Sequence, residues 1–227
     1  MVSYEIIVKG GSFKLSNAFM GLANLSLVET SEGAMLFDTG HYSNRRALIE
    51  GLAAKGYRPQ DIPIVVLSHL HFDHSANIDL FPQAHVILAR REWEYAAKPH
   101  PDDLYIPWKI RELLEDYRLT LVDEEADIAK DVRFLLTPGH TPGSSALALN
   151  TAEGTVVLAG DAVKYPKEWL LGRPDMAFDT MEHGSRSIRR IVEMADVIVP
   201  GHFQRACRCA EGHFAWEEDA EMTLVMR

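Results

Sequence analysis

The chain has 227 residues, 47% of them hydrophobic, and its 33 acidic and 23 basic side chains give a formal net charge of −10. This acidic balance disfavours general binding to nucleic acid phosphates, and no apolar run reaches the roughly 18 residues of a membrane span. A chain of this length can build one large core, so we expect a single domain over residues 1–227. The opening residues lack the pattern of a secretory signal, and we therefore expect a cytoplasmic protein.

The first third of the chain predicts antiparallel strands, then a helix and a buried strand. The strand-like runs are residues 4–10, 25–30 and 34–40, and a turn at 31–33 joins the last two as a hairpin. A helix is predicted over 44–55, with Ser43 as its N-cap and Gly56 as its C-cap. The β-branched run 62–68 predicts a buried strand.

The middle of the chain predicts a strand at 84–90 and helices at 91–97 and 108–117. Four aromatic residues gather here: Trp93, Tyr95, Tyr105 and Trp108. Aromatic residues at such spacing are usually core, and we expect them there. The prolines of this stretch leave open the alternative that it is a mobile cover over a pocket.

Four predicted strands end directly at a histidine or an aspartate. The run 62–68 leads into the H-x-H-x-D-H motif of 69–74, and the run 133–137 precedes His140. A hairpin over 146–160 ends at Asp161, and a strand beginning at 196 ends before His202. Such clustering indicates a metal site at the strand ends.

The spacing of the motif suits two metal ions. Two histidines that are two residues apart point the same way on an extended segment and can chelate one ion, which leaves Asp73 and His74 for a neighbour. His140 would complete the first set, and Asp161 is suited to bridge the ions. The candidate ligands are His69, His71, Asp73, His74, His140, Asp161 and His202.

Two divalent ions roughly 3.5 to 4 Å apart would share a hydroxide, because bound water has its pKa lowered toward about 7. Zinc is the expected metal, although manganese, iron, cobalt and nickel accept the same nitrogen and oxygen ligands. No role is predicted for five other histidines, which are His41, His85, His100, His183 and His213. The two cysteines, Cys207 and Cys209, are expected to be unpaired thiols without a role.

The motifs SHLHFDH, TPGHTPGS, LAGDA and VPGH, in that order, resemble the metallo-β-lactamase-fold hydrolase superfamily from Asp38 to His202. The resemblance implies an α+β fold, the four-layer αβ/βα sandwich, with metals at one sheet edge. It assigns the first ion to His69, His71 and His140, the second to Asp73, His74 and His202, and the bridge to Asp161. It also implies that the Asp38 carboxylate supports the metal loop.

Among subfamilies, the chain is similar to the small lactonases that open acyl-homoserine lactones. Those enzymes carry a tyrosine three residues after the bridging aspartate, where this chain has Lys164 followed by Tyr165. Either side chain could polarise a substrate carbonyl. The chain also resembles small metallo-β-lactamase-domain proteins, some of which are linked to RNA cleavage.

The expected reaction is hydrolysis of an ester-like bond, foremost a lactone such as an acyl-homoserine lactone, with Asp73 as general acid for the leaving oxygen. A thioester hydrolase, a phosphodiesterase or ribonuclease, and an iron-dependent redox enzyme remain alternatives on the same site. The phosphodiesterase would use a basic patch of Arg186, Arg189, Arg190, Arg205 and Arg208. An aspartic protease built on Asp38-Thr39-Gly40 would leave the metal-type ligands unexplained.

The expected partner is a small-molecule substrate and not a membrane. Nucleic acid is disfavoured by charge and stays open only with the phosphodiesterase alternative. Segments 93–108 and 164–180 are expected to form the pocket walls that select the substrate. The sequence carries no signal for an oligomeric state.

Overall fold

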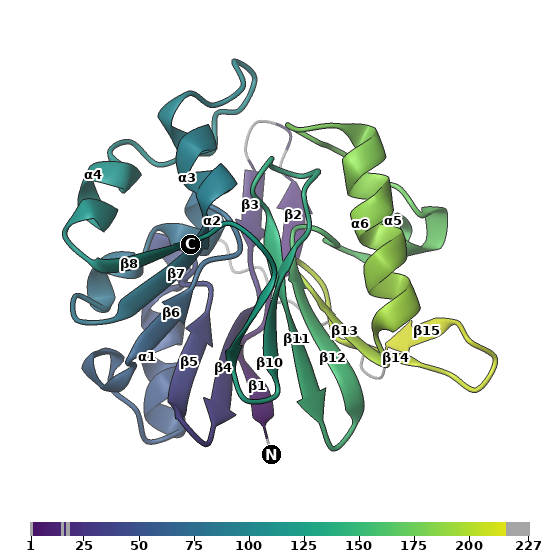
Figure 1. The fold of residues 1–227 in the computed structure, drawn as a ribbon, viewed down its shortest axis with the longest axis horizontal. Helices are drawn as coiled ribbons and strands as arrows, with labels where there is room; N and C mark the ends of the chain where they lie inside the picture. The colour runs from purple at the N-terminus through teal and green to yellow at the C-terminus, as the bar shows by residue number, and fades with distance from the viewer. Residues whose placement is uncertain (1, 15, 17–18, 217–227) are drawn as a thin grey trace.

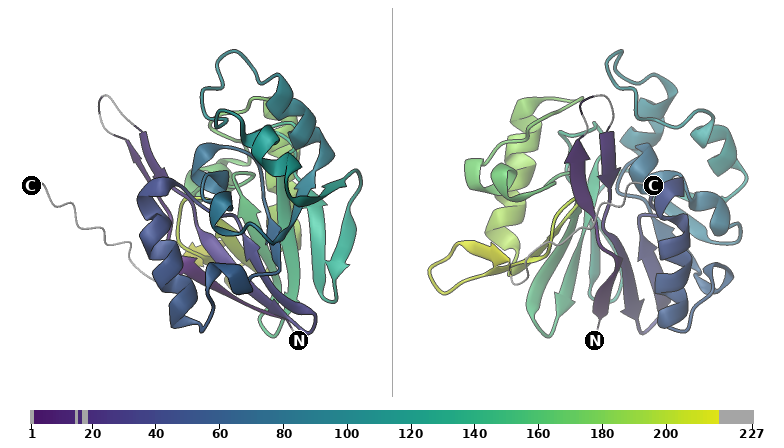
Figure 2. Two further views of the ribbon diagram at one scale, coloured as in Figure 1. Left: turned by 90° about the vertical axis from the view of Figure 1, so that its left-hand side faces the viewer. Right: turned by 180° about the vertical axis from the view of Figure 1, so that it is seen from behind.

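The structure, a computed structural model, describes residues 2–14, 16 and 19–216. Two twisted sheets pack face to face, and helices lie on the two outer sides (Figure 1). The first sheet has the order β1-β4-β5-β6-β7-β8, and the second has the order β15-β14-β13-β12-β11-β10-β9. A separate pair of strands, β2 (Gly11–Lys14) and β3 (Phe19–Leu22), stands above the seam between the sheets (Figure 2).

The first half of the chain forms the first sheet and the helices that accompany it. The strands are β1 (Ser3–Val8), β4 (Leu25–Thr30), β5 (Gly33–Phe37), β6 (Ile64–Val66), β7 (His85–Ala89) and β8 (Arg118–Val122). The helices are α1 (Arg45–Ala54), α2 (Phe72–Ser75), α3 (Arg90–Ala97) and α4 (Ile110–Glu115). The predicted hairpin between β4 and β5 is confirmed, and strands β5 to β8 run parallel.

The second half is mostly antiparallel sheet with two helices. The strands are β9 (Ala126–Ala129), β10 (Val132–Leu136), β11 (Ser145–Thr151), β12 (Gly154–Gly160), β13 (Val197–Pro200), β14 (Ala206–Arg208) and β15 (Phe214–Trp216). The helices are α5 (Pro166–Leu171) and α6 (Met181–Met194). Strands β12 and β13 run parallel, so both deliver their carboxyl ends to the same edge.

Three apolar layers hold the sheets and helices together. Between the sheets, Phe37 and Phe134 belong to one buried cluster. Leu48 of α1 packs in a second cluster on the outside of the first sheet, and Ile188 of α6 packs in a third on the outside of the second sheet. This helix–sheet–sheet–helix order confirms the predicted four-layer sandwich.

Several local predictions were wrong in detail. A 3-10 turn, Tyr42–Asn44, contains Ser43, and α1 starts only at Arg45, with Asn44 as an N-cap residue whose side chain makes no capping hydrogen bond. The helix expected over 108–117 is shorter, because Lys109 adopts a left-handed conformation with φ 61° just before Ile110. Gly56 does follow α1 with φ 81°, as its predicted position requires.

The aromatic stretch divides between the core and the surface. Trp93 packs against the outer core of the first sheet. Trp108 is 86% exposed, so the expectation that it lies in the core was wrong.

Within the part of the chain that the structure describes, no helix is long and apolar enough to cross a bilayer.

The sheet interface makes a direct stability prediction. Leu158 of β12 is fully buried between the sheets, so Leu158→Ala should lower the free energy of unfolding by about 2–5 kcal/mol through lost contacts and an unfilled cavity. Leu104→Ala is the matched control, because Leu104 is 84% exposed and its truncation should change stability by no more than about 0.5 kcal/mol. Denaturant titration measures both, and equal losses would contradict the assigned core.

Candidate metal centre

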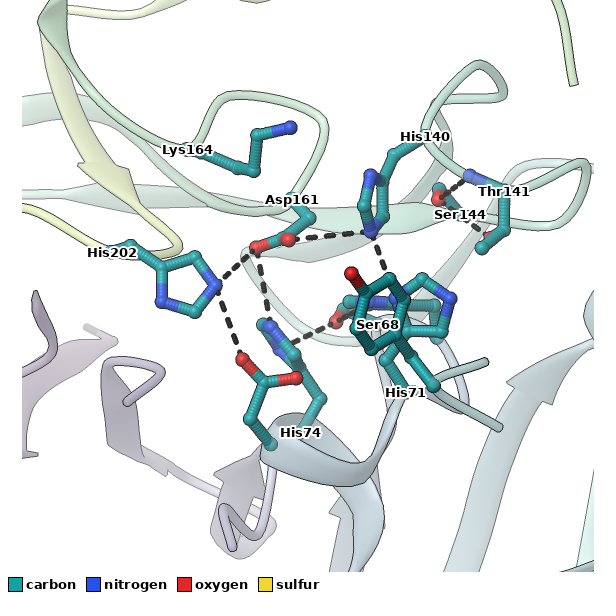
Figure 3. A network of polar contacts seen from close by, with 12 residues as sticks. Ser68, His71, His74, His140, Thr141, Ser144, Asp161, Lys164 and His202 are labelled. Carbon is teal, nitrogen blue, oxygen red and sulfur yellow. Dashed lines mark hydrogen bonds and ion pairs between the residues drawn. The ribbon is translucent and has the colours of Figure 1, made fainter. Parts of the chain in front are cut away.

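The site lies at the edge where the carboxyl ends of strands from both sheets meet. His69 and His71 follow β6, and Asp73 and His74 lie on the short helix α2. The remaining candidates follow β10, β12 and β13: His140, Asp161 and His202. The structure therefore brings all of the predicted ligand residues together, from strands far apart in sequence (Figure 3).

Three buried imidazoles form the first group. The ligand atoms of His69, His71 and His140 all lie within 4.8 Å of one another. Nδ1 of His71 is 3.0 Å from Nε2 of His140, a separation at which two nitrogen lone pairs can converge on one cation. Three imidazoles with an open fourth position make up a typical catalytic zinc set.

The second group combines Asp73, His74 and His202, again within 4.8 Å. Nε2 of His202 is 3.4 Å from Oδ2 of Asp73. Asp161 lies between the groups, because its Oδ1 is 3.2 Å from Nε2 of His74 and its Oδ2 is 3.3 Å from Nε2 of His140. One carboxylate thus faces both groups, as the sequence predicted for a bridging residue.

A glycine makes room for this carboxylate. A Cβ atom on Gly201 would lie 2.2 Å from Oδ1 of Asp161. Any larger residue in the V-P-G-H motif would therefore displace the aspartate, which explains why glycine precedes His202.

Hydrogen bonds on the outer side of the rings decide which nitrogen faces inward. Nδ1 of His74 donates to Oδ2 of Asp38 at 2.7 Å, and Nδ1 of His202 donates to the carbonyl of Leu22 at 3.0 Å. Nε2 of His71 donates to Oδ2 of Asp103 at 3.0 Å. Each bond fixes a tautomer in which the opposite nitrogen presents its lone pair to the centre.

Asp38 also anchors the start of the ligand loop. Its Oδ1 accepts from the backbone N–H of Ser68 at 2.7 Å, and its Oδ2 accepts from the Ser68 hydroxyl at 2.8 Å. The Ser68 oxygen can then accept from Nδ1 of His69 at 2.9 Å. Both oxygens of the Asp38 carboxylate accept hydrogen bonds from residues of its own chain. This geometry does not fit the shared carboxylate pair of an aspartic protease.

Inward-facing atoms lack ordinary hydrogen bonds. Nε2 of His69 is buried without a hydrogen-bond partner in the described residues, and Nε2 of His74 and Oδ1 of Asp161 face each other at 3.2 Å without forming a hydrogen bond. Such atoms are costly unless something else satisfies them. Their number and chemistry fit divalent cations, which neutral imidazole and carboxylate ligands bind well.

Electrostatics divide the histidines into two kinds. Burial holds the pKa values of His69 and His140 well below their usual range, so both rings are neutral. Although burial opposes it, the carboxylates of Asp161, Asp38 and Asp73 raise the pKa of His74. The negative charge around His74 is the charge that a divalent cation would balance in place of a proton.

A cavity of about 400 Å³ opens onto both groups. The two segments that the sequence suggested contribute Tyr105, Lys164, Tyr165 and Met176 to its walls, and Ser12 of β2 adds a wall residue that the sequence did not suggest. The Tyr105 ring lies 5.4 Å from the ring of His71. Phe178 adds a further ring, 5.6 Å from His71.

Lys164 and Tyr165 both face this cavity, but each already has a partner. Nζ of Lys164 lies 3.1 Å from the buried carboxylate of Glu168. The Tyr165 hydroxyl donates to Asp175 at 2.6 Å, and burial, with that hydrogen bond, raises the pKa of Tyr165 well above its ordinary value. Lys164 therefore brings a cation to the pocket, and Tyr165 a protonated hydroxyl.

Sequence reasoning missed two features. Asp103, whose carboxylate orients His71, lies 32 positions further along the chain, and no local pattern marks it. Cys209, Glu211 and His213 form a group on the β14–β15 hairpin whose ligand atoms also lie within 4.8 Å of one another. Neither cysteine forms a disulfide.

The predicted basic patch is largely neutralised. Arg186 pairs with Glu182, Arg190 with Glu125 and Arg205 with Glu153. The guanidinium of Arg208 donates to backbone carbonyls, among them that of Ala195 at 2.8 Å. Arg189 is exposed, so only part of the predicted patch keeps an open charge for a phosphate.

Comparison with known proteins agrees with this geometry. The model of the metallo-beta-lactamase superfamily matches residues 20–202. Metallo-beta-lactamase domain-containing protein 1 of Rattus norvegicus is 34% identical over 86% of this chain and 71% of its own length. The chain is 32% identical to the human counterpart of that protein and spans 62% of its length.

Lactonases also resemble the chain in sequence and structure. An N-acyl homoserine lactonase of Bacillus cereus is 29% identical over 74% of each chain. A solved quorum-quenching N-acyl homoserine lactone lactonase has a TM-score of 0.70 and 25% identity, and the similarity covers 89% of this chain and 91% of that one. Because the family model spans most of the sequence and a relative matches it nearly throughout, the chain belongs to the metallo-beta-lactamase superfamily and is a metal-dependent hydrolase.

Proposed function

We propose that the protein hydrolyses a lactone or a closely related ester at a dinuclear metal site, with zinc as the metal. The observation that carries the proposal is the Asp161 carboxylate, which faces both ligand groups at the base of a cavity of about 400 Å³. The similarity to N-acyl homoserine lactonases supports the choice of substrate class. The proposed ligand set is the predicted one: His69, His71, Asp73, His74, His140, Asp161 and His202.

When bound, two divalent ions acidify water and polarise a substrate carbonyl. The chain's own residues supply the rest of the reaction. Asp38 and Asp103 hold the rings of His74 and His71 in the orientation that binding requires. Tyr105 and Met176 provide an apolar surface for an acyl chain, and they limit the access of bulk water to the cavity.

Opening a lactone leaves an alkoxide oxygen that must gain a proton. The Asp73 carboxylate lines the cavity and belongs to the second ligand group, so it lies next to the reacting centre. We propose that this carboxylate accepts the proton that the attacking water loses and then passes it to the alkoxide oxygen. Lys164 is assigned the role of carbonyl donor, since its ammonium is the cation that lines this cavity.

Other substrates receive less support from the structure. A phosphodiesterase would need cationic surface, and most of the candidate arginines are paired. The proposed location is the cytoplasm, where thiols such as those of Cys207 and Cys209 stay reduced. We further propose that residues 1–227 act as one domain.

Metal analysis and substrate assays test the proposed function. Purified protein should contain about two equivalents of zinc, and removal of the metal with a chelator should abolish lactone hydrolysis until zinc is added back. Parallel assays use a thioester and a phosphodiester. Iron with oxygen consumption, or cleavage of the phosphodiester alone, would contradict the proposal and favour the corresponding alternative.

The role of Asp73 makes a separate prediction. Asp73→Asn keeps an oxygen ligand but cannot carry a proton, so kcat should fall about 10²–10⁴-fold while more than half of the metal is retained. Kinetics and elemental analysis on the same sample measure both. A loss of turnover in proportion to metal would show that Asp73 is only a ligand.

Lys164 is tested by its removal. Lys164→Met should lower kcat/KM about 10-fold or more, because a charged hydrogen-bond donor to the substrate is lost. Lys130→Met, at an exposed position between β9 and β10, is the control and should leave kcat/KM unchanged. Melting temperatures are recorded for both variants, because the first also leaves the buried Glu168 carboxylate without its ammonium partner. Unchanged kinetics in Lys164→Met would remove this residue from the site.

A further inference from the structure

A buried glutamate links the two loops that supply the first group of imidazoles. Glu92 lies in the first turn of α3 with no exposed surface. Among the described residues no lysine or arginine pairs with its carboxylate, and burial raises the pKa of Glu92. A carboxylate without a cationic partner in the core is costly, so its hydrogen bonds must hold it there.

Those hydrogen bonds come from both ligand loops. Oε1 accepts from the backbone N–H of Leu70 at 3.0 Å, and Leu70 stands between His69 and His71 in the sequence. Oε2 accepts from the Thr141 hydroxyl at 2.6 Å, and Thr141 directly follows His140. A single carboxylate thus spans the β6–α2 loop of one sheet and the β10–β11 loop of the other.

The β10–β11 loop contacts both the side chain and the backbone of Glu92. Oε2 accepts from the N–H of Gly143 at 3.2 Å. A Cβ atom on Gly143 would lie only 2.0 Å from the backbone nitrogen of Glu92. The loop that carries His140 is therefore pressed against the start of α3, and the distance between the loops depends on that helix.

We propose that Glu92 is a positioning residue that sets the spacing of His69, His71 and His140 and thereby the affinity of one of the two metal sites. It touches neither the ligand atoms nor the cavity. The inference rests on the proposed dinuclear site. The other ligand group, Asp73, His74 and His202, receives its orientation from Asp38 and Leu22, so it should not depend on Glu92.

The geometry also predicts that glutamine cannot replace this residue. The backbone N–H groups of Leu70 and Gly143 face different oxygens of Glu92, and both are donors. A glutamine side chain has one oxygen, so its NH₂ group would face one of these donors. Glu92→Gln should consequently release one of the two loops although its shape is nearly unchanged.

Chelator competition with Zn²⁺ tests this proposal on the full chain. In Glu92→Gln, one zinc equivalent should bind about 10–100-fold more weakly, while the other stays within about threefold of wild type. Glu94→Gln is the matched control, since Glu94 is an exposed residue of the same helix, and it should bind both ions as wild type does. Thr141→Val removes only the hydroxyl and should weaken the same equivalent, and Thr141→Ser should restore it.

The outcomes separate this role from a structural one and from the proposed function. Unchanged zinc affinity at both sites in Glu92→Gln would overturn the inference. An equal loss of zinc affinity at both sites, together with a lower melting temperature of the metal-free protein, would also overturn it. If Glu92→Gln does not fold, Thr141→Val and Thr141→Ser decide the question in the same way. A wild-type protein that binds two zinc ions but hydrolyses no lactone contradicts the proposed function alone.

Discussion

Five imidazoles and two carboxylates are removed from water at a single sheet edge, and the rest of the structure depends on satisfying them. Each of these groups would be well solvated in the unfolded chain, and an isolated buried charge is strongly unfavourable. The fold meets this cost in two ways. Asp38, Asp103 and a backbone carbonyl accept hydrogen bonds from the outer ring nitrogens of His74, His71 and His202, and the inner atoms are left for cations.

The four-layer architecture makes such a site possible. Apolar clusters on both faces of each sheet hold the two sheets in a fixed relation, so strand ends that are distant in sequence meet reproducibly. Parallel pairs at β5 to β7 and at β12 and β13 send their following loops to one edge. The ligands then need only short loops, which keeps their positions well defined.

Specificity is built from a different set of segments. The loop around Tyr105 and the segment that includes Lys164 and Met176 line the cavity beside the candidate ligands. A lysine occupies the position where similar lactonases are expected to have a tyrosine, and it is held by a buried glutamate. Most of the cavity wall and the candidate metal ligands thus come from different parts of the chain.

The sequence by itself singled out the candidate ligand residues, because H-x-H-x-D-H and the histidines and aspartate at strand ends are local patterns with a chemical meaning. It also predicted β1, β4, β5, β6 and β7, where β-branched runs alternate with helical periodicity, but it did not predict β2, β3 or β8. Tertiary structure decided everything that depends on contacts across the fold. Asp103 and Glu92 carry no local signal, and they act only because α3 and its following loop pack against the ligand loops. Trp108 is of a residue type that is often buried, but it lies on the surface. Burial depends on the surrounding packing and not on the residue type alone.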